Sequence, residues 1–257
     1  MLILLAPSEG KSAPVSGPPL DLATLAHADS LTPARERALA ALIKLSSGRE
    51  STALRSLGLS RAQAPELVRN AVLRESPTAP AAEVYTGVLY QHLALADMSA
   101  EARARAGDNV LVASALWGVV GLDDHIPAYR MSMGADIRSL RRGMPAFWRR
   151  ALAEALPDSE GELVLDLRSG SYAAAWKPKR STVVQIRAVT PEGNVISHMA
   201  KATRGCVARA VLESQTQPHD PAAIAATVAA AGVGEAARLS DPKRVGAPWV
   251  LEVVDSV

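Results

Sequence analysis

Two cationic side chains stand three residues apart where the sequence predicts the start of a helix. An apolar alternating segment ends at Met199, and a helix-like run follows with Lys201 and Arg204 in its first turn. Residues three apart share one face of a helix, and the first turn also presents unpaired backbone N–H groups and a partial positive charge. The pattern predicts a pocket suited to an anion; the alternative is a solvated helix start with two surface cations.

Further cations follow other predicted elements along the chain. Lys11 comes after an apolar strand, Arg130 after a loop, and Lys177-Pro178-Lys179 after a segment of small residues. Pro178 restricts the backbone between its two lysines and so holds their side chains apart. If the ends of these elements converge, the cations line one cleft. The predicted nucleic-acid or anion-binding residues are Lys11, Arg130, Lys177, Lys179, Lys201 and Arg204.

Two functions fit such a cleft. In the first, the chain binds DNA phosphates, which agrees with an excess of Lys and Arg over Asp and Glu between residues 130 and 209. That excess also fits arginines on solvated helix faces. In the second, the chain is an enzyme that acts on a small anionic substrate, with Lys201 and Arg204 holding the anion. The candidate catalytic residues for proton transfer are then Glu9, Tyr129 and Lys177.

The sequence contains no motif for a metal or a cofactor. Its five histidines lack the spacing of metal ligands, and residues 7–11 lack the upstream glycine of a Walker A phosphate loop. The single cysteine, Cys206, excludes an internal disulfide and a zinc site built from cysteines, and it fits a reducing compartment. On an apolar helix face it is expected to be a packed small residue and not a nucleophile. We therefore expect no metal and no cofactor.

The composition indicates a helix-rich protein that packs with small side chains. Of the 257 residues, 48% are apolar but only 4% are aromatic, which is not the composition of a disordered chain. No apolar run approaches the roughly 20 residues that a membrane-spanning helix needs. The apolar start is short, lacks a basic flank and is followed at once by Pro7, so it is not a signal peptide. These features predict a cytoplasmic protein without membrane contact.

Periodicity predicts strands and helices that interleave irregularly. Strands are expected at residues 2–6, 109–116, 162–167, 182–189 and 194–199, the last two as a hairpin, and at 249–254 as an edge strand. Helices are expected at residues 32–46, 50–57, 62–74, 98–106, 136–156, 201 onward and 220–231. No internal repeat or low-complexity linker is present. The chain is thus predicted to be α+β, with a single domain over residues 1–257.

At these same residues the chain resembles the YaaA family of bacterial peroxide-stress proteins. The matching motifs run in the family's order and span nearly the whole chain, so their combination is specific although each one is short. They are residues 1–4 with Lys11, residues 84–87, 116–119 and 127–130 with 133–134, Lys177-Pro178-Lys179, and Ala200-Lys201 with Arg204-Gly205.

The resemblance implies an α+β fold in which a mixed sheet wraps around helices, including a helix-hairpin-helix element. It also implies a positively charged cleft, binding to DNA, and a role in limiting iron-dependent oxidative damage. The hairpin would fall around residues 57–61 between two predicted helices. A typical hairpin of this type has two glycines that let backbone N–H groups approach a phosphate, and here only Gly58 is available.

This sequence departs from the family pattern at three places. Glu9 adds a carboxylate to the loop after the first strand, residues 171–176 lack a lysine, and Ala202 replaces a second lysine after Lys201. Fewer cations weaken extended contact with a duplex, because nonspecific affinity grows with each phosphate neutralised. The same changes leave a compact pocket in place. Because no iron-binding cluster is present, any effect on iron would be indirect.

Overall fold

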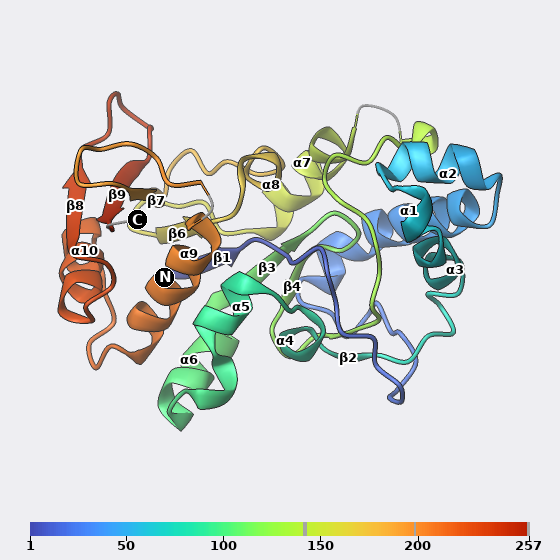
Figure 1. Ribbon diagram of the computed structural model, residues 1–257, viewed down its shortest axis with the longest axis horizontal. Helices are drawn as coiled ribbons and strands as arrows, with labels where there is room; N and C mark the ends of the chain where they lie inside the picture. Colours follow the sequence, from blue (N-terminus) through green and yellow to red (C-terminus); the bar gives the residue numbers. More distant parts are fainter. Residues whose placement is uncertain (141–142, 198, 256–257) are drawn as a thin grey trace.

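A mixed seven-stranded sheet runs through the molecule in the order β4-β3-β1-β6-β7-β9-β8 (Figure 1). The computed structural model describes residues 1–140, 143–197 and 199–255. Strands β3, β1, β6, β7 and β9 are parallel, and β4 and β8 join the two edges in antiparallel register. The strands are β1 (Leu2–Leu5), β3 (Val110–Ser114), β4 (Gly118–Gly121), β6 (Leu163–Leu167), β7 (Thr182–Val189), β8 (Ala236–Ser240) and β9 (Trp249–Val254).

A second, two-stranded sheet pairs β2 (Ala79–Pro80) with β5 (His125–Ile126). The longer helices are α1 (Ala28–Ser46), α2 (Glu50–Leu57), α3 (Pro65–Ala71), α6 (Ala100–Asn109), α7 (Met144–Ala155), α9 (Ala200–Glu213) and α10 (Pro221–Ala230). The shorter ones are α4 (Ala81–Val84), α5 (Val88–Leu93) and α8 (Gly170–Ala173), with 3-10 turns η1 (Arg61–Gln63), η2 (Leu95–Asp97) and η3 (Arg138–Leu140).

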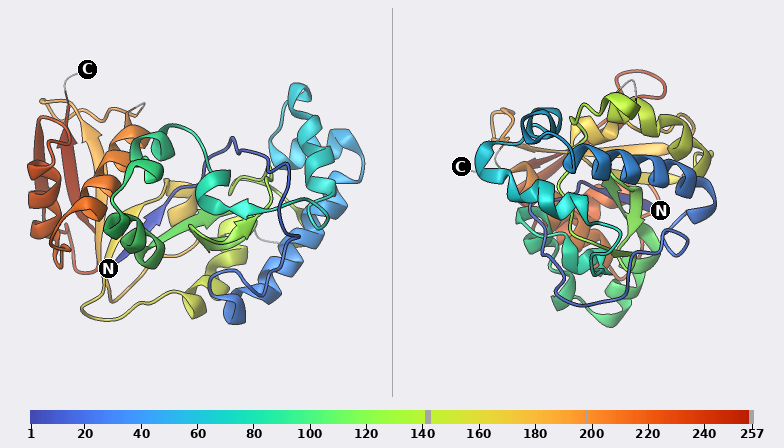
Figure 2. Two further views of the ribbon diagram at one scale, coloured as in Figure 1. Left: turned by 90° about the horizontal axis from the view of Figure 1, so that it is seen from below. Right: turned by 90° about the vertical axis from the view of Figure 1, so that its right-hand side faces the viewer.

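Helices cover the middle of the sheet on both faces. Every residue of β1 and β6 is buried, as expected for parallel strands that read as continuous apolar runs. One hydrophobic core contains buried residues from Leu2 to Val253, so the chain forms a single domain. The sheet therefore lies inside the helices, whereas the resemblance predicts strands wrapped around helices. Helices α1–α3 form one end of the molecule, and α10 with β8 and β9 forms the other (Figures 1 and 2).

Most strand predictions are confirmed, and two are wrong. The predicted hairpin of 182–189 with 194–199 is reduced to one bridge between Val189 and Val195; of that segment, residue 198 lies outside the described residues. The reason is that β9 pairs with residues 184–189 along one edge of β7 and β6 pairs with residues 182–185 along the other, so only the last residues of β7 remain free for the returning segment. For the same reason β9 is internal and not an edge strand, and β8 takes the edge beyond it.

The strand order creates a topological switch beside β1. After β1 the chain passes through α1–α6 and returns as β3 on one side of β1, whereas β6 pairs with the opposite side. The loops after β1 and β6 therefore leave the same edge of the sheet and diverge. In open α/β sheets, ligands bind in the crevice outside the carboxyl ends of strands at such a point. Within the described ranges, no helix has both the length and the apolar character needed to cross a bilayer.

Candidate functional site

A cavity of about 350 Å³ lies where the loops after β1 and β6 diverge, and we call it the switch-point cavity. Its walls come from residues 6–9 after β1, the start of α5, residues 132–134, residues 169–172 after β6, and the first turns of α9. Lys201 and Arg204 are both among the lining residues, as is Glu9. The cationic helix face that the sequence predicts thus borders a cavity at the carboxyl edge of the sheet.

Helix α9 points its first turn at this cavity. It begins at Ala200 without a side-chain cap, and the first-turn amides of such a helix lack intrahelical acceptors. Arg204 is half-buried, and burial lowers its pKa while the nearby Asp166 carboxylate opposes that shift. Gly205 lets α9 pack directly on α5, because a Cβ at this position would lie 2.3 Å from the Leu89 carbonyl oxygen. The cavity is therefore formed by two closely packed helices and two strand ends.

Arg130 is connected to the cavity wall by an ion pair with Glu9. The Arg130 Nη2 lies 2.9 Å from Glu9 Oε2, and the Glu9 side chain is 74% exposed while that of Arg130 is 20% exposed. The fully buried Asn70 of α3 fixes the Arg130 backbone from behind. Its Nδ2 donates to the Arg130 carbonyl at 2.8 Å, and its Oδ1 accepts from the Arg130 amide at 2.9 Å. Arg130 is thus held at its backbone, and its guanidinium is paired only with an exposed carboxylate.

Lys11 lies behind Glu9, over two tyrosine rings. Its Nζ donates to the Ser8 carbonyl oxygen at 2.8 Å and lies 4.2 Å from the centre of the Tyr129 ring and 5.4 Å from that of Tyr85. Burial, with a contribution from the Arg130 guanidinium, lowers the pKa of Lys11 to about 7. A lysine with that pKa is partly uncharged at neutral pH.

All four tyrosines of the chain gather around this region. The Tyr129 hydroxyl is 2.9 Å from that of Tyr85 and 2.7 Å from Ser114 Oγ. Tyr90, whose hydroxyl donates to the Ala6 carbonyl, and Tyr172 line the cavity itself. Burial raises the pKa of Tyr129 and of Tyr85 well above the ordinary value, so both phenols stay protonated. Tyr129 therefore cannot accept a proton as a phenolate near neutral pH.

The sequence gives no local signal for two further groups that shape the site. The Ser114 Oγ accepts from the amides of Leu116 and Trp117, which fixes the turn between β3 and β4. Behind the other wall, Arg168 forms a buried two-bond pair with Asp166, at 2.7 and 2.9 Å, and donates to the Trp176 carbonyl. This pair holds the start of the loop that carries Tyr172. Neither interaction has a spacing that indicates a function.

Lys177 and Lys179 do not line the switch-point cavity. Both side chains are exposed, and the Lys179 amide donates to Asp158, which precedes β6, just before the chain enters β7. That places Lys179 toward the edge of the sheet opposite to the carboxyl ends. The structure thus brings together Glu9, Lys11, Arg130, Lys201 and Arg204.

A separate cationic cavity of about 540 Å³ lies between α1, α2 and η3, and we call it the α2 groove. It is lined by four cations, Lys44, Arg49, Arg55 and Arg138, and by one carboxylate, Asp136. None of these residues was among the predicted binding residues. Their spacing along α1 and α2 indicates only solvated helix faces, so the sequence alone does not single them out.

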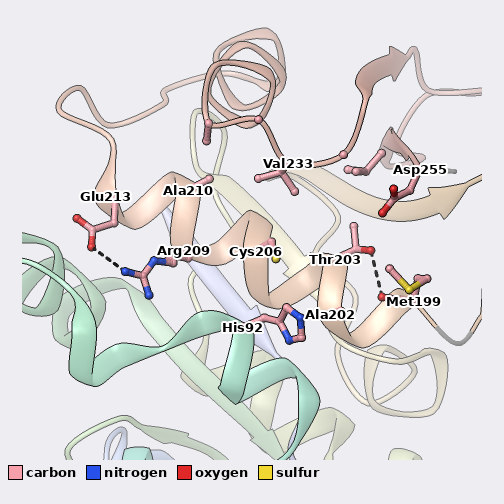
Figure 3. Close-up of a pocket in the computed structure, with 14 residues that line it drawn as sticks. His92, Met199, Ala202, Thr203, Cys206, Arg209, Ala210, Glu213, Val233 and Asp255 are labelled. Atoms are coloured by element: carbon pink, nitrogen blue, oxygen red, sulfur yellow. Dashed lines mark hydrogen bonds and ion pairs between the residues drawn. The ribbon is translucent and has the colours of Figure 1, made fainter. Parts of the chain in front are cut away.

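A third cavity, of about 440 Å³, lies on the side of α9 that faces the C-terminal strands (Figure 3). Cys206 of α9 is half-buried in the wall of this cavity, and Val233 and Asp255 also line it. Burial raises the pKa of the Cys206 thiol, which disfavours the reactive thiolate. Over the described ranges, no group of three or more His, Cys, Asp or Glu side chains is arranged to hold a metal ion.

Sequence comparisons agree with the motifs. The sequence profile described as peroxide stress protein YaaA matches residues 1–231. A UPF0246 protein of Streptomyces coelicolor is 42% identical over 259 residues, which cover 99% of this chain and 98% of the relative. UPF0246 proteins of Corynebacterium glutamicum and Corynebacterium efficiens are each 37% identical over 238 residues, covering 91% of this chain and 94% of the relative. The chain therefore belongs to the family of the peroxide stress protein YaaA.

Proposed function

We propose that this peroxide stress protein binds a small anion in the switch-point cavity, with Lys201 and Arg204 as its principal ligands. One observation carries the proposal: two cations of α9 line a cavity at the carboxyl ends of β1 and β6. The cavity volume of about 350 Å³ suits a drug-sized or smaller ligand. Phosphate and carboxylate groups are the anions that a helix start with Lys and Arg side chains favours.

The remaining groups support an enzyme more than a passive receptor. Arg130 is preorganised by Asn70 and can exchange Glu9 for a ligand carboxylate or phosphate. Hydroxyls of Ser8, Ser169 and Ser171 line the same space and supply neutral hydrogen-bonding partners. Glu9 itself is the candidate acid or base at the entrance. The reaction class is an acid–base reaction on a small anionic substrate.

DNA binding is a second candidate, and the α2 groove is the observation that favours it. Its four cations include Arg49, which precedes α2, and Arg55 in the last turn of α2. The chain then turns at Gly58 into η1 and α3. Gly58 has φ of 66° and open space beside its Cα, and its own N–H donates to the Arg55 carbonyl oxygen at 3.2 Å. In this proposal α2, Gly58 and α3 form the helix-hairpin-helix element, and the α2 groove binds the DNA backbone.

The peroxide-stress role follows from the family, and we propose that the protein acts in the cytoplasm. Its effect on iron-dependent damage would be indirect. It would act either through the product of a reaction in the switch-point cavity or by binding DNA and shielding it. Lys177 and Lys179 would contribute only to the second route, as exposed cations outside the cavity.

Thermal shift distinguishes the two functions. A ligand that binds only the folded state stabilises it by about 2.7 kcal/mol at a hundredfold excess over Kd. Inorganic phosphate, nucleoside monophosphates, small organic acids and duplex DNA would be tested on wild type, Lys201→Ala and Arg55→Ala. Lys179→Ala is the matched control for the anion measurements, because it removes an exposed lysine outside both cavities.

The small-anion function predicts that an anion raises the Tm of wild type, Arg55→Ala and Lys179→Ala but not of Lys201→Ala. The DNA function predicts a shift with duplex that falls steeply with salt and is lost in Arg55→Ala. Equal anion shifts in all four proteins would reject the switch-point cavity as the anion site.

A further inference from the structure

Hydroxyl groups are the most frequent polar groups on the wall of the switch-point cavity. Seven of its sixteen lining residues carry a hydroxyl, whereas three carry a charge. Three of the seven hydroxyls are bonded to the backbone of the loop after β1. Ser8 and Thr86 donate to the Gly10 carbonyl oxygen at 2.6 and 3.3 Å. Tyr90 donates to the Ala6 carbonyl oxygen at 2.9 Å, so these three hydroxyls fix that loop.

Three serine hydroxyls of the cavity have no backbone partner. Across residues 1–140, 143–197 and 199–255, Ser132 Oγ makes no hydrogen bond, and Ser169 Oγ and Ser171 Oγ are paired only with each other. Their separation of 3.5 Å is longer than an ordinary O–H···O bond. A backbone hydrogen bond between Met133 and the Tyr172 hydroxyl joins the two wall segments that carry these serines. The three hydroxyls are therefore grouped in one part of the wall and are available to a ligand.

The charged groups of the cavity restrict the kind of anion that fits. Lys201 and Arg204 are two cations on one face of α9. A phosphate monoester has a charge of about −1.5 to −2 at neutral pH and three terminal oxygens, so it suits two cations better than a carboxylate does. A second acid group on the ligand is disfavoured by Glu9, and an ammonium group is disfavoured by the two α9 cations and the nearby Arg130. The rest of the ligand is therefore uncharged.

We propose that the ligand of the switch-point cavity is a monosaccharide phosphate. Its phosphate binds the two α9 cations, and its sugar hydroxyls bind Ser132, Ser169 and Ser171. A serine hydroxyl donates one hydrogen bond and accepts others, as a sugar hydroxyl does, so each can serve the other in either role. This inference rests on the proposed function, because the phosphate must bind at the two α9 cations for the sugar to reach the serines.

The size of the cavity and the apolar part of its wall agree with a single sugar ring. The volume of about 350 Å³ lies near the lower end of the range for ligand pockets, about 300–1,000 Å³. Leu89, Met133 and the ring of Tyr172 supply apolar surface for the C–H groups of the sugar. An alkyl phosphate of similar length would make the same apolar contacts but would leave the three serine hydroxyls without partners. Because unpaired hydroxyls are unfavourable, the alkyl phosphate should bind more weakly than the sugar phosphate.

Isothermal titration calorimetry with three probes tests the sugar specificity. Inorganic phosphate, butyl phosphate and ribose 5-phosphate would be titrated into wild type, Ser132→Ala, Ser169→Ala/Ser171→Ala and Lys201→Ala/Arg204→Ala. Ser47→Ala is the control, because it removes an exposed serine outside the cavity. Wild type should bind ribose 5-phosphate at least about tenfold more tightly than either other probe. Each serine variant of the cavity should lose about threefold to tenfold in affinity for ribose 5-phosphate alone, and Ser47→Ala should match wild type.

The same titrations separate this inference from the proposed function. If ribose 5-phosphate binds no tighter than butyl phosphate while both lose affinity in Lys201→Ala/Arg204→Ala, the cavity binds anions but does not recognise sugars, and the inference is overturned. It is also overturned if the cavity serine variants weaken all three probes equally, because the serines then act only on the shape of the wall. Affinities that are unchanged in Lys201→Ala/Arg204→Ala reject the anion site itself, and the sugar proposal with it.

Discussion

At the scale of single residues, the Glu9–Arg130 pair places a carboxylate of the protein where a ligand anion would bind. Glu9 lines the switch-point cavity and pairs with the guanidinium that Asn70 orients. An exposed ion pair contributes little to stability, about 0–1 kcal/mol, because solvent screens it. Its effect on an incoming anion is larger, since Glu9 both repels that anion and occupies Arg130. The Glu9 carboxylate therefore affects the affinity for an anion more than the free energy of unfolding.

Glu9→Gln tests this tuning. We expect phosphate or monophosphate affinity to rise by about threefold to tenfold, equivalent to about 0.7–1.4 kcal/mol, while the free energy of unfolding changes by less than about 1 kcal/mol. Isothermal titration calorimetry gives the affinity. Glu154→Gln is the control, because it breaks the exposed pair with Arg150 on α7, away from the cavity lining. Unchanged or weaker binding by Glu9→Gln would show that Glu9 does not compete with the ligand.

The buried amine of Lys11 makes stability depend on pH. Its pKa is about 7 when folded and about 10.4 when unfolded. Between these values the unfolded chain binds more protons, so the free energy of unfolding rises with pH, and the full penalty applies below about pH 7. From about pH 7 to about pH 9, wild type should gain about 1–2 kcal/mol relative to Lys11→Met in urea unfolding. Lys179→Met should show no such difference, and parallel curves for wild type and Lys11→Met would refute the lowered pKa.

Asn70 is the residue that connects α3 to the site. Asn70→Ala leaves the amide and carbonyl of Arg130 without their partners, and we expect a loss of about 2–4 kcal/mol in chemical unfolding. Asn109→Ala removes a single side-chain bond to the Arg105 carbonyl and should lose about 1 kcal/mol. Anion affinity should fall only in Asn70→Ala. Equal losses of unfolding free energy and equal anion affinities in the two variants would show that Asn70 does not position Arg130 for the anion.

At the scale of elements, α9 carries the anion ligands and depends on its contact with α5. A Cβ on Gly205 would meet the Leu89 carbonyl oxygen at 2.3 Å and His92 Cβ at 2.8 Å, so the helices must separate. Gly205→Ala should therefore cost about 1–3 kcal/mol, although alanine is the better helix former. Thermal unfolding and phosphate titration measure the two effects. Gly170→Ala, with open space at its Cβ, should stay within about 0.5 kcal/mol of wild type; the same result for Gly205→Ala would show that the helices adapt.

The element predictions succeed where the local pattern is strong. Local composition and periodicity are enough to predict the buried apolar strands β1, β3 and β6. They also predict the helix that carries Lys201. The hairpin after β7 fails because strand pairing is not local. Only the sheet reveals that β9 pairs along one edge of β7 and that β6 pairs with the first half of the other edge. Strand β8, which alternates half-buried and exposed residues, gives no comparable signal.

At the scale of the whole molecule, strand order determines which predicted cations meet. The sequence predicts one cleft for Lys11, Arg130, Lys201 and Arg204 on the condition that the ends of their elements converge. Lys177 and Lys179 are assigned to it on the same condition. The structure gathers the first four near one edge of the sheet, but Lys179 precedes β7 and so lies toward the opposite edge. The order of the elements along the chain does not specify the direction of each strand or which strands are neighbours in the sheet. Asn70 and Ser114 give no signal in the sequence for the same reason, since the residues they bond to at the site are 60 and 15 positions away.

The central claim is that an anion binds between Lys201 and Arg204 at the switch point of the sheet. Crystals of the wild-type protein grown or soaked with selenate would locate an oxyanion by its anomalous scattering. We expect a strong selenium peak in the switch-point cavity, within hydrogen-bonding distance of the Lys201 and Arg204 side chains. The peak should be absent from crystals of Lys201→Ala/Arg204→Ala. Selenium peaks confined to the α2 groove, with none in the switch-point cavity at saturating selenate, would contradict it.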